Sequence, residues 1–374
     1  MKLFVLLVSF LATVTAYGGA ASLQQGSTFS LLGGERISPH GDSSKSSSGL
    51  TFDLESQKFQ RLADSGVDRA QHSVVEHEGE WFIFGGETGD VQRHNPETGA
   101  YETVECNGDQ PNARVGHSAV VFKNVMYVLG GRADDNVDAS FVAFDLSTNS
   151  WREMPATPFG AIADHSAAIA DGLMWVFGGV DARGRARNSL WTFDFATEQW
   201  TQSEVSQDST VAPQARAGHS ALVVDQEMLI FGGEAADGTL LHDVWALHLD
   251  ADSKVAPSFA RAAVLDEATA PSPRAHAALA FYDHALWVFG GRGAGTTFLD
   301  VWALDLEYLQ WELISCFPGV AFPACREAAI TTEPAHDSPL SEFRYASPGV
   351  SEATYTVRLN SQPRAPVRVV PDID

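Results

Sequence analysis

Short apolar runs separated by brief polar links recur along most of the chain. A representative stretch contains the run Ala221–Val224, the polar link Asp225–Glu227 and a second run, Met228–Phe231, which ends in a glycine pair. Runs of this length, rich in Val, Ile, Leu, Phe and Trp, suit strands better than helices. The short polar link predicts a hairpin between the first two strands. A third strand is predicted where Asp243–Leu247 follows the next loop.

The glycine pair recurs six times, each time at the end of such an apolar run. The first glycines are separated by 52, 45, 48, 54 and 58 residues, and the pairs are Gly33-Gly34, Gly85-Gly86, Gly130-Gly131, Gly178-Gly179, Gly232-Gly233 and Gly290-Gly291. A period near 50 indicates an array of similar supersecondary units. One aromatic residue anchors the fourth strand of each unit, and Trp151, Trp200 and Trp311 are the tryptophans at this position. Four antiparallel strands per unit, repeated about six times, predict the blades of a β-propeller.

The units resemble the kelch repeat, in which a strand ends in Gly-Gly and spaced aromatic residues follow it. The matching pieces extend over roughly residues 27–332. The resemblance implies an all-β fold, a six-bladed kelch-type β-propeller related to the galactose oxidase-like central-domain superfamily. Glycine can adopt a positive φ or allow close backbone approach where the second strand ends. The aromatic rings are expected to fill the space between blades, where burying one is worth about 1.5–3 kcal/mol.

Closure of the ring is expected to use both ends of the chain. The strand Thr28–Leu32 has no evident hairpin partner before it, so the first unit is expected to lack its first strand. The segment 326–332 follows Trp311 at the distance where a first strand belongs, but no glycine pair follows it. We therefore expect residues 326–332 to complete the first blade, which would also leave fewer exposed sheet edges.

Histidine and arginine also recur once per unit in most units. A His-Ser pair begins four first strands, at His72, His117, His165 and His219. An arginine lies 16 residues before the glycine pair in four units, at Arg69, Arg114, Arg216 and Arg274. Two units depart from this pattern: Ile162 replaces the arginine in one, and Ala277 replaces the histidine in the other, where His276 lies one place earlier. Residues repeated around a ring favour a structural role, with His and Ser bonding backbone groups; a ring of metal-binding histidines is the alternative. A Ser-His-Asp triad needs one convergent constellation, so Asp164-His165-Ser166 is not assigned to catalysis. The sequence predicts no catalytic residue, metal or cofactor.

The two ends of the chain differ from the repeats. The apolar run Leu3–Val14 predicts a secretory signal peptide over 1–16, cleaved near Ala16, and is too short for a membrane span. The propeller is assigned to 17–335. Residues 336–374 are assigned to a linker and a partial β-sandwich-like segment with strands at 351–359 and 366–371. This segment resembles the opening of a Calx-beta or immunoglobulin-like module, and an unstructured tail is the alternative.

Cysteine content and charge limit the possible partners. Cys316 and Cys325 are candidates for a disulfide in an oxidising compartment, which leaves Cys106 over. The chain carries 48 Asp and Glu against 24 Lys and Arg, a formal net charge of −24. A surface this acidic argues against binding nucleic acid or anionic lipid through a broad basic face.

The longest connectors are expected on one face of the propeller, because alternating strand direction brings the links after the second and fourth strands to the same side. Variable loops on a rigid scaffold are where binding usually occurs. The sequence therefore predicts a secreted binding or scaffold module that recognises a protein or glycan. Glu87, Arg132, Glu234 and Arg292 each directly follow a glycine pair and are candidates for this face. The kelch resemblance also implies an alternative, a secreted sugar-processing enzyme such as a galactose oxidase-like oxidase or an epimerase.

Overall fold

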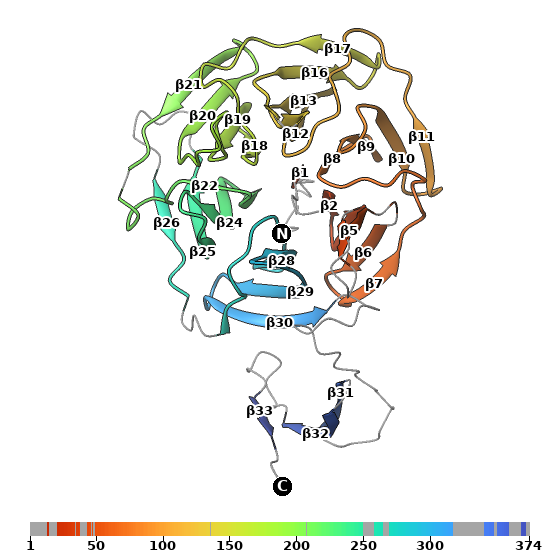
Figure 1. Cartoon of the computed structure of the whole chain (residues 1–374), viewed down its shortest axis with the longest axis vertical. Coiled ribbons are helices and arrows are strands. Elements are labelled where there is room, and N and C mark those ends of the chain that lie inside the picture. Colours follow the sequence, from red (N-terminus) through yellow and green to blue (C-terminus); the bar gives the residue numbers. More distant parts are fainter. Residues whose placement is uncertain are drawn as a thin grey trace, which may run out of the picture.

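The computed structural model describes residues 13–14, 21–33, 35–37, 43–45, 47, 49–134, 136–206, 208–249, 258–264, 269–316, 340–347, 350–358 and 368–371. The described chain forms six antiparallel sheets arranged as blades around a central axis, which confirms the all-β, six-bladed propeller (Figure 1). In each blade the first strand lies nearest the axis and the fourth at the rim, so chain order runs outward within every unit.

Each blade has four main strands, which follow one another from the axis to the rim. Blades 1 and 2 contain, in this order, β2 (Ala21–Gln25), β3 (Thr28–Leu32), β6 (Gly49–Asp53) and β7 (Lys58–Arg61), and β8 (His72–His77), β9 (Glu80–Gly85), β10 (Val91–Asn95) and β11 (Ala100–Thr103). Blades 3 and 4 contain β12 (Ser118–Phe122), β13 (Val125–Leu129), β16 (Phe141–Asp145) and β17 (Ser150–Glu153), and β18 (Ser166–Ala170), β19 (Leu173–Phe177), β20 (Leu190–Asp194) and β21 (Gln199–Ser203). Blades 5 and 6 contain β23 (Ser220–Val224), β24 (Glu227–Ala235), β25 (Leu240–His248) and β26 (Phe259–Arg261), with β22 (Arg216–Ala217) pairing the end of β24, and β27 (Ala278–Tyr282), β28 (Ala285–Gly293), β29 (Thr296–Asp305) and β30 (Gln310–Cys316).

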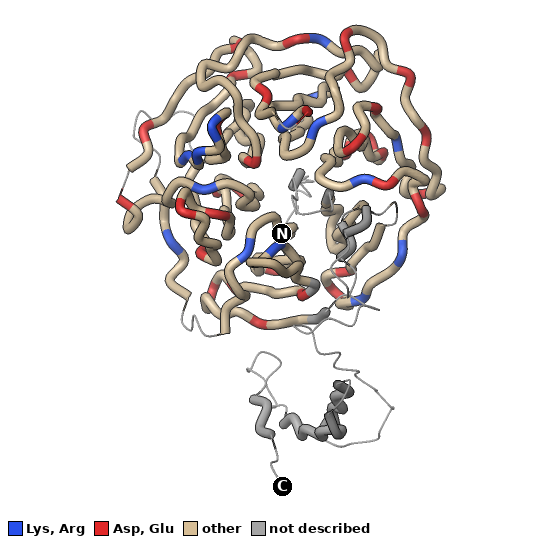
Figure 2. The backbone as a smooth tube through the Cα atoms, in the orientation of Figure 1, with Lys and Arg blue, Asp and Glu red and all other residues tan. Residues whose placement is uncertain are grey.

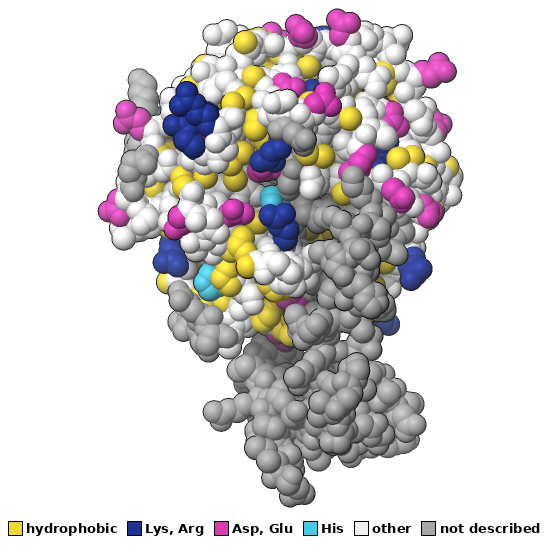
Figure 3. Space-filling view, viewed as in Figure 1, with side chains coloured by type: hydrophobic (Ala, Val, Ile, Leu, Met, Phe, Trp, Pro, Cys, Tyr) yellow, Lys and Arg dark blue, Asp and Glu magenta, His cyan; other side chains and the backbone are white. Residues whose placement is uncertain are grey.

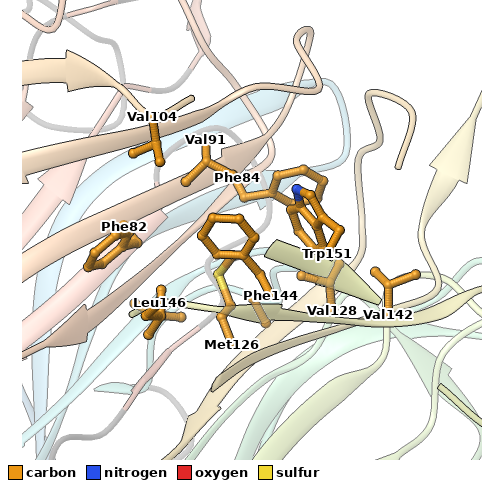
Figure 4. Close-up of a cluster of buried hydrophobic side chains, with 12 residues drawn as sticks. Phe82, Phe84, Val91, Val104, Met126, Val128, Val142, Phe144, Leu146 and Trp151 are labelled. Carbon is orange, nitrogen blue, oxygen red and sulfur yellow. The ribbon is translucent and has the colours of Figure 1, made fainter. Parts of the chain in front are cut away.

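The hydrophobic core lies between neighbouring blades. In Figure 4, Trp151 of β17 lies beside Phe84 of β9 and Phe144 of β16. Its ring centroid is 5.1 Å from that of Phe84, which belongs to the preceding blade, and 4.7 Å from that of Phe144 in its own blade. Trp200 and Trp311 contact the preceding blade in the same way, through Phe141 and Phe231. The rim aromatics thus fill the space that widens with distance from the axis.

Closure of the ring differs from the expectation. β3 pairs with β2 on one side and with β6 on the other, so both of its edges are occupied. The expected place for residues 326–332 beside β3 was therefore wrong, and these residues lie outside the described part of the chain. The first strand of blade 1 comes from the N-terminal segment instead, joined to β3 by a tight turn at Gly26, whose φ is +60°. A short strand, β1 (Thr13–Val14), pairs with the other edge of β2.

Blade 1 meets blade 6 through side chains. The Gln24 amide spans to β27, where its Oε1 accepts from the Phe281 backbone N–H at 2.9 Å and its Nε2 donates to the Phe281 carbonyl at 2.6 Å. Phe29 stacks on Phe289 with ring centroids 4.2 Å apart. The seam between the first and last blades is closed by these contacts.

Three smaller sheets complete the described structure. β4 (Glu35–Ile37) pairs with β5 (Ser43–Lys45), and β14 (Arg132–Ala133) pairs with β15 (Asn136–Val137). Beyond the propeller, β31 (Leu340–Ser347), β32 (Val350–Arg358) and β33 (Arg368–Pro371) form an antiparallel sheet. β32 and β33 correspond to the two strands expected in the tail, and β31 is a further one. Cys325 and the side chain of Cys316 lie outside the described residues, so their pairing stays a prediction; Cys106 is a free, half-buried thiol.

Candidate binding face

Alternating strand direction places the connectors after the second and fourth strands of every blade on one side, called here the loop face. Buried arginines stabilise the connectors of this face through hydrogen bonds and ion pairs. In four blades the arginine before the inner strand donates to the carbonyl of the first glycine of the pair in its own blade: Arg69 to Gly85 (2.8 Å), Arg114 to Gly130 (3.1 Å), Arg216 to Gly232 (3.0 Å) and Arg274 to Gly290 (2.7 Å). Each also forms an ion pair with an aspartate near the start of the third strand: Asp90, Asp138, Asp243 and Asp300. These arginines therefore tie the two connectors of a blade together.

The glycine pairs make backbone contact with the next blade. Gly130 has a left-handed φ of +60°, and a Cβ there would lie 2.1 Å from the Ile162 carbonyl oxygen of blade 4. That oxygen accepts a hydrogen bond from Gly131 N–H at 2.8 Å. The same bond joins Gly86 to Arg114, Gly179 to Arg216 and Gly233 to Arg274, each at 2.9 Å. The recurring glycines are thus required where two blades touch.

The His-Ser pairs form a belt of bonds between blades. The Nε2 atoms of His117, His165 and His219 lie 2.8–2.9 Å from the serine hydroxyls of the preceding blade, Ser73, Ser118 and Ser166. The expected backbone partners were thus not the main ones. Ser220 does donate to a backbone carbonyl, that of Ala277, which replaces histidine in blade 6. Burial lowers the pKa of His72, His117 and His165 to about 3, so these imidazoles are neutral at physiological pH.

A second belt, made of backbone, lies at the inner rim of the loop face. The residue before each inner-strand His position has a positive φ: Gln71, Gly116, Asp164, Gly218 and His276. Asp164 N–H donates to Gly116, Gly218 to Asp164 and His276 to Gly218, at 2.8, 2.8 and 2.6 Å. Two units place glycine at this left-handed position, whereas Gln71, Asp164 and His276 carry side chains there, and of these three Asp164 and His276 are titratable.

Two of the four charged candidates, Arg132 and Arg292, gather near these rim residues. Arg132 forms a close ion pair with Asp164, whose side chain is only 7% exposed. Burial, then the charges of Arg292 and Arg132, lowers the pKa of His276 to about 3. We call Arg132, Asp164, His276 and Arg292 the axial cluster. Near the centre of the propeller, Figure 3 shows Lys or Arg side chains on either side of a histidine.

The other two candidates lie on different blades. A Glu87 carboxylate oxygen accepts from the Ala70 backbone N–H at 2.9 Å within blade 2, and Glu234 pairs with Ala217 in the β22–β24 ladder of blade 5. Sequence reasoning set Asp164 and His276 aside as parts of the repeat. The signal that could have identified them is their alignment with Gly116 and Gly218, because a side chain at a position that other units give to glycine needs a reason.

Replacing Arg132 with alanine is expected to reduce the free energy of unfolding by about 1–3 kcal/mol, since the nearly buried Asp164 carboxylate loses its guanidinium partner. Chemical denaturation of the two proteins measures the difference. Asp164→Asn in the Arg132→Ala background should recover most of the loss, because asparagine is neutral and tolerates a positive φ. Failure of the double variant to recover would contradict the assigned pair.

Among the described residues, no group of three or more His, Cys, Asp and Glu side chains is placed to hold a metal ion. The same residues contain no helix that is long and apolar enough to span a membrane.

Comparison with known proteins agrees with the repeat architecture. Residues 71–212 and 206–336 match the model of the KLHDC2/KLHL20/DRC7 Kelch-repeats domain. Similar proteins include the flagellar outer-arm dynein alpha chain of Chlamydomonas reinhardtii, 29% identical over 60% of this chain and 5% of its own length. Acyl-CoA-binding domain-containing protein 4 of Arabidopsis thaliana is 28% identical over 61% and 34% of the two chains. Host cell factor 1 of Rattus norvegicus is 29% identical over 61% and 12%. The chain therefore spans about a third or less of the length of each of these relatives. Because the family model covers more than half of it, this chain belongs to the KLHDC2/KLHL20/DRC7 Kelch-repeats family.

Proposed function

We propose that this protein is a secreted binding module whose loop face docks a partner protein. The observation that supports this most directly is the contrast between the two faces. Opposite the loop face, tight turns such as Lys123-Asn124 and Asp171-Gly172 join the strands. On the loop face, connectors such as 130–140, 178–189 and 204–215 are longer and differ in sequence from blade to blade.

The loops can vary because the scaffold beneath them is fixed. The buried arginines, the glycine contacts and the His-Ser belt hold the connector ends through groups that recur in most blades. Binding residues are often found on loops that a rigid scaffold positions. The kelch repeats that this chain shares with proteins such as host cell factor 1 and an F-box/kelch-repeat protein of Arabidopsis thaliana support a role as a protein-binding scaffold.

Secretion is the second part of the proposal. It is supported by the apolar run Leu3–Val14 and the small residues at Thr15-Ala16. Cleavage after Ala16 would remove β1 but keep β2, which begins at Ala21, so blade 1 would retain four strands.

A photo-crosslinking amino acid placed at Ala236, an exposed loop-face residue in the turn between β24 and β25, should capture a specific protein from medium conditioned by the expressing cells. The matched position is Asn124, exposed in a turn of the opposite face. Mass spectrometry identifies the captured species. Equal capture from both positions, or capture only from Asn124, would refute the loop face as the docking surface.

A further inference from the structure

The connector between β19 and β20 concentrates positive charge in an acidic protein. It contains Arg183, Arg185 and Arg187 within five residues, whereas the whole chain has 24 Lys and Arg against 48 Asp and Glu. Arg183 is exposed, the Arg185 side chain is 68% exposed, and that of Arg187 is 27% exposed. In Figure 3, Lys or Arg side chains form a prominent group over the β20 region at the upper left, while Figure 2 shows Asp and Glu spread around the rim.

The nearly buried carboxylate of Asp181 holds this connector in one conformation. One of its oxygens accepts from the backbone N–H groups of Arg183 and Arg185 at 2.8 and 3.0 Å, and the other accepts from Arg185 Nε and Nη2 at 2.9 and 2.7 Å. Gly184 turns the chain at a φ of +72° and donates to the Asp181 carbonyl at 2.8 Å. The hydrogen bonds from Arg185 hold the pKa of Asp181 well below its usual value, so the carboxylate stays ionised.

The local charge is strongly positive at the surface. The connector carries three guanidinium groups and one ionised carboxylate, a net charge of +2, and the carboxylate is only 7% exposed whereas the arginines are more accessible. Arg187 is fixed from below, since its Nη1 donates to the Phe159 carbonyl at 3.0 Å and its Nη2 lies 3.6 Å from Asp181. Two arginines are thus anchored beside Asp181, and the exposed Arg183 lies in the same turn.

We propose that Arg183, Arg185 and Arg187, the arginine patch, bind an acidic segment of a partner polypeptide through its Asp or Glu carboxylates. The proposal rests on the loop face being the docking surface. A guanidinium presents paired N–H donors that match the geometry of a carboxylate. The anchored turn reduces the ordering cost of binding. Because the rest of the protein is strongly acidic, an acidic segment would be repelled elsewhere and drawn to this patch, which fixes its register on the face.

The binding test uses the full chain and two fluorescent peptides, one with four glutamates spaced by Gly-Ser and one with glutamines in their place. Fluorescence anisotropy should show binding of the glutamate peptide that weakens as NaCl rises, and at least tenfold weaker binding of the glutamine peptide. Arg183→Glu should weaken glutamate-peptide binding at least tenfold, because it replaces an exposed cation with an anion. Arg61→Glu makes the same charge change at an exposed position of β7 in blade 1 and should alter the affinity less than twofold.

Several outcomes would overturn the proposal. These are equal binding of both peptides, equal effects of Arg183→Glu and Arg61→Glu, and preferential binding of a sulfated oligosaccharide over the glutamate peptide. A fourth is self-association of the protein that Arg183→Glu abolishes, measured by analytical ultracentrifugation. The arginine patch would then bind a second copy of this protein and not an acidic segment of a partner. Unchanged thermal midpoints of both variants show that folding is intact. Photo-capture from Ala236 that persists in the Arg183→Glu variant would reject the arginine patch while leaving the loop face as the docking surface.

Discussion

Lowering the pH from 7.5 to 5 is expected to reduce the free energy of unfolding by about 6 kcal/mol. His72, His117 and His165 are 2–4% exposed, and burial lowers the pKa of each to about 3. In the unfolded chain their pKa returns to about 6.5, so below that pH the unfolded state binds protons that the folded state does not. At pH 5 each of these three histidines then costs about 2 kcal/mol, and His219 and His276, whose pKa values are also lowered, act in the same direction.

Denaturant unfolding at pH 7.5, 6 and 5 measures this loss. The loss is comparable with the whole stability of a typical domain, roughly 5–15 kcal/mol. The window from pH 6.5 to 5 isolates the imidazoles, because the aspartates whose pKa is lowered, such as Asp181 and Asp243, titrate below it. A stability that stays flat down to pH 5 would show that the buried imidazoles are not neutral partners of the serines.

Replacing Gly130 with alanine is expected to cost roughly 3 kcal/mol or more. Its φ of +60° strains any residue with a Cβ by about 1–2 kcal/mol. A Cβ there would also lie 2.1 Å from the Ile162 carbonyl oxygen, so blades 3 and 4 must separate locally and weaken the Gly131–Ile162 hydrogen bond.

Gly172→Ala provides the matched comparison. Gly172 has a similar φ of +75°, but no heavy atom lies within 4 Å of the Cβ position. Thermal and denaturant unfolding should show that Gly172→Ala costs only the backbone strain, about 1–2 kcal/mol. Equal costs for the two variants would mean that contact between blades does not explain the glycine pair.

The repeat predicted the blades because each unit packs against its neighbours through the same types of residue. A glycine pair in each unit and an aromatic at each rim are visible in any alignment of the chain with itself. The first strand of blade 1 could not be predicted in this way. Its sequence, Ala-Ser-Leu-Gln-Gln, is more polar than the other inner strands, because Gln24 uses its amide to bond the β27 backbone across the seam.

The axial cluster was only partly predictable for a related reason. Arg132 and Arg292 could be singled out because each follows a glycine pair. Asp164, the partner of Arg132, occurs in the next unit, and only the ring brings Arg132 near His276 of blade 6. The arginine patch depends on Asp181, whose burial and hydrogen bonds are properties of the folded turn.

In the described residues, blade 1 draws its strands from residues 13–61 alone, and it meets blade 6 through Gln24 and stacked rings. Parting these two blades would break no β-ladder, because each sheet keeps all of its own strands. The ring is therefore closed by side-chain contacts and not by a sheet that the two ends of the chain share.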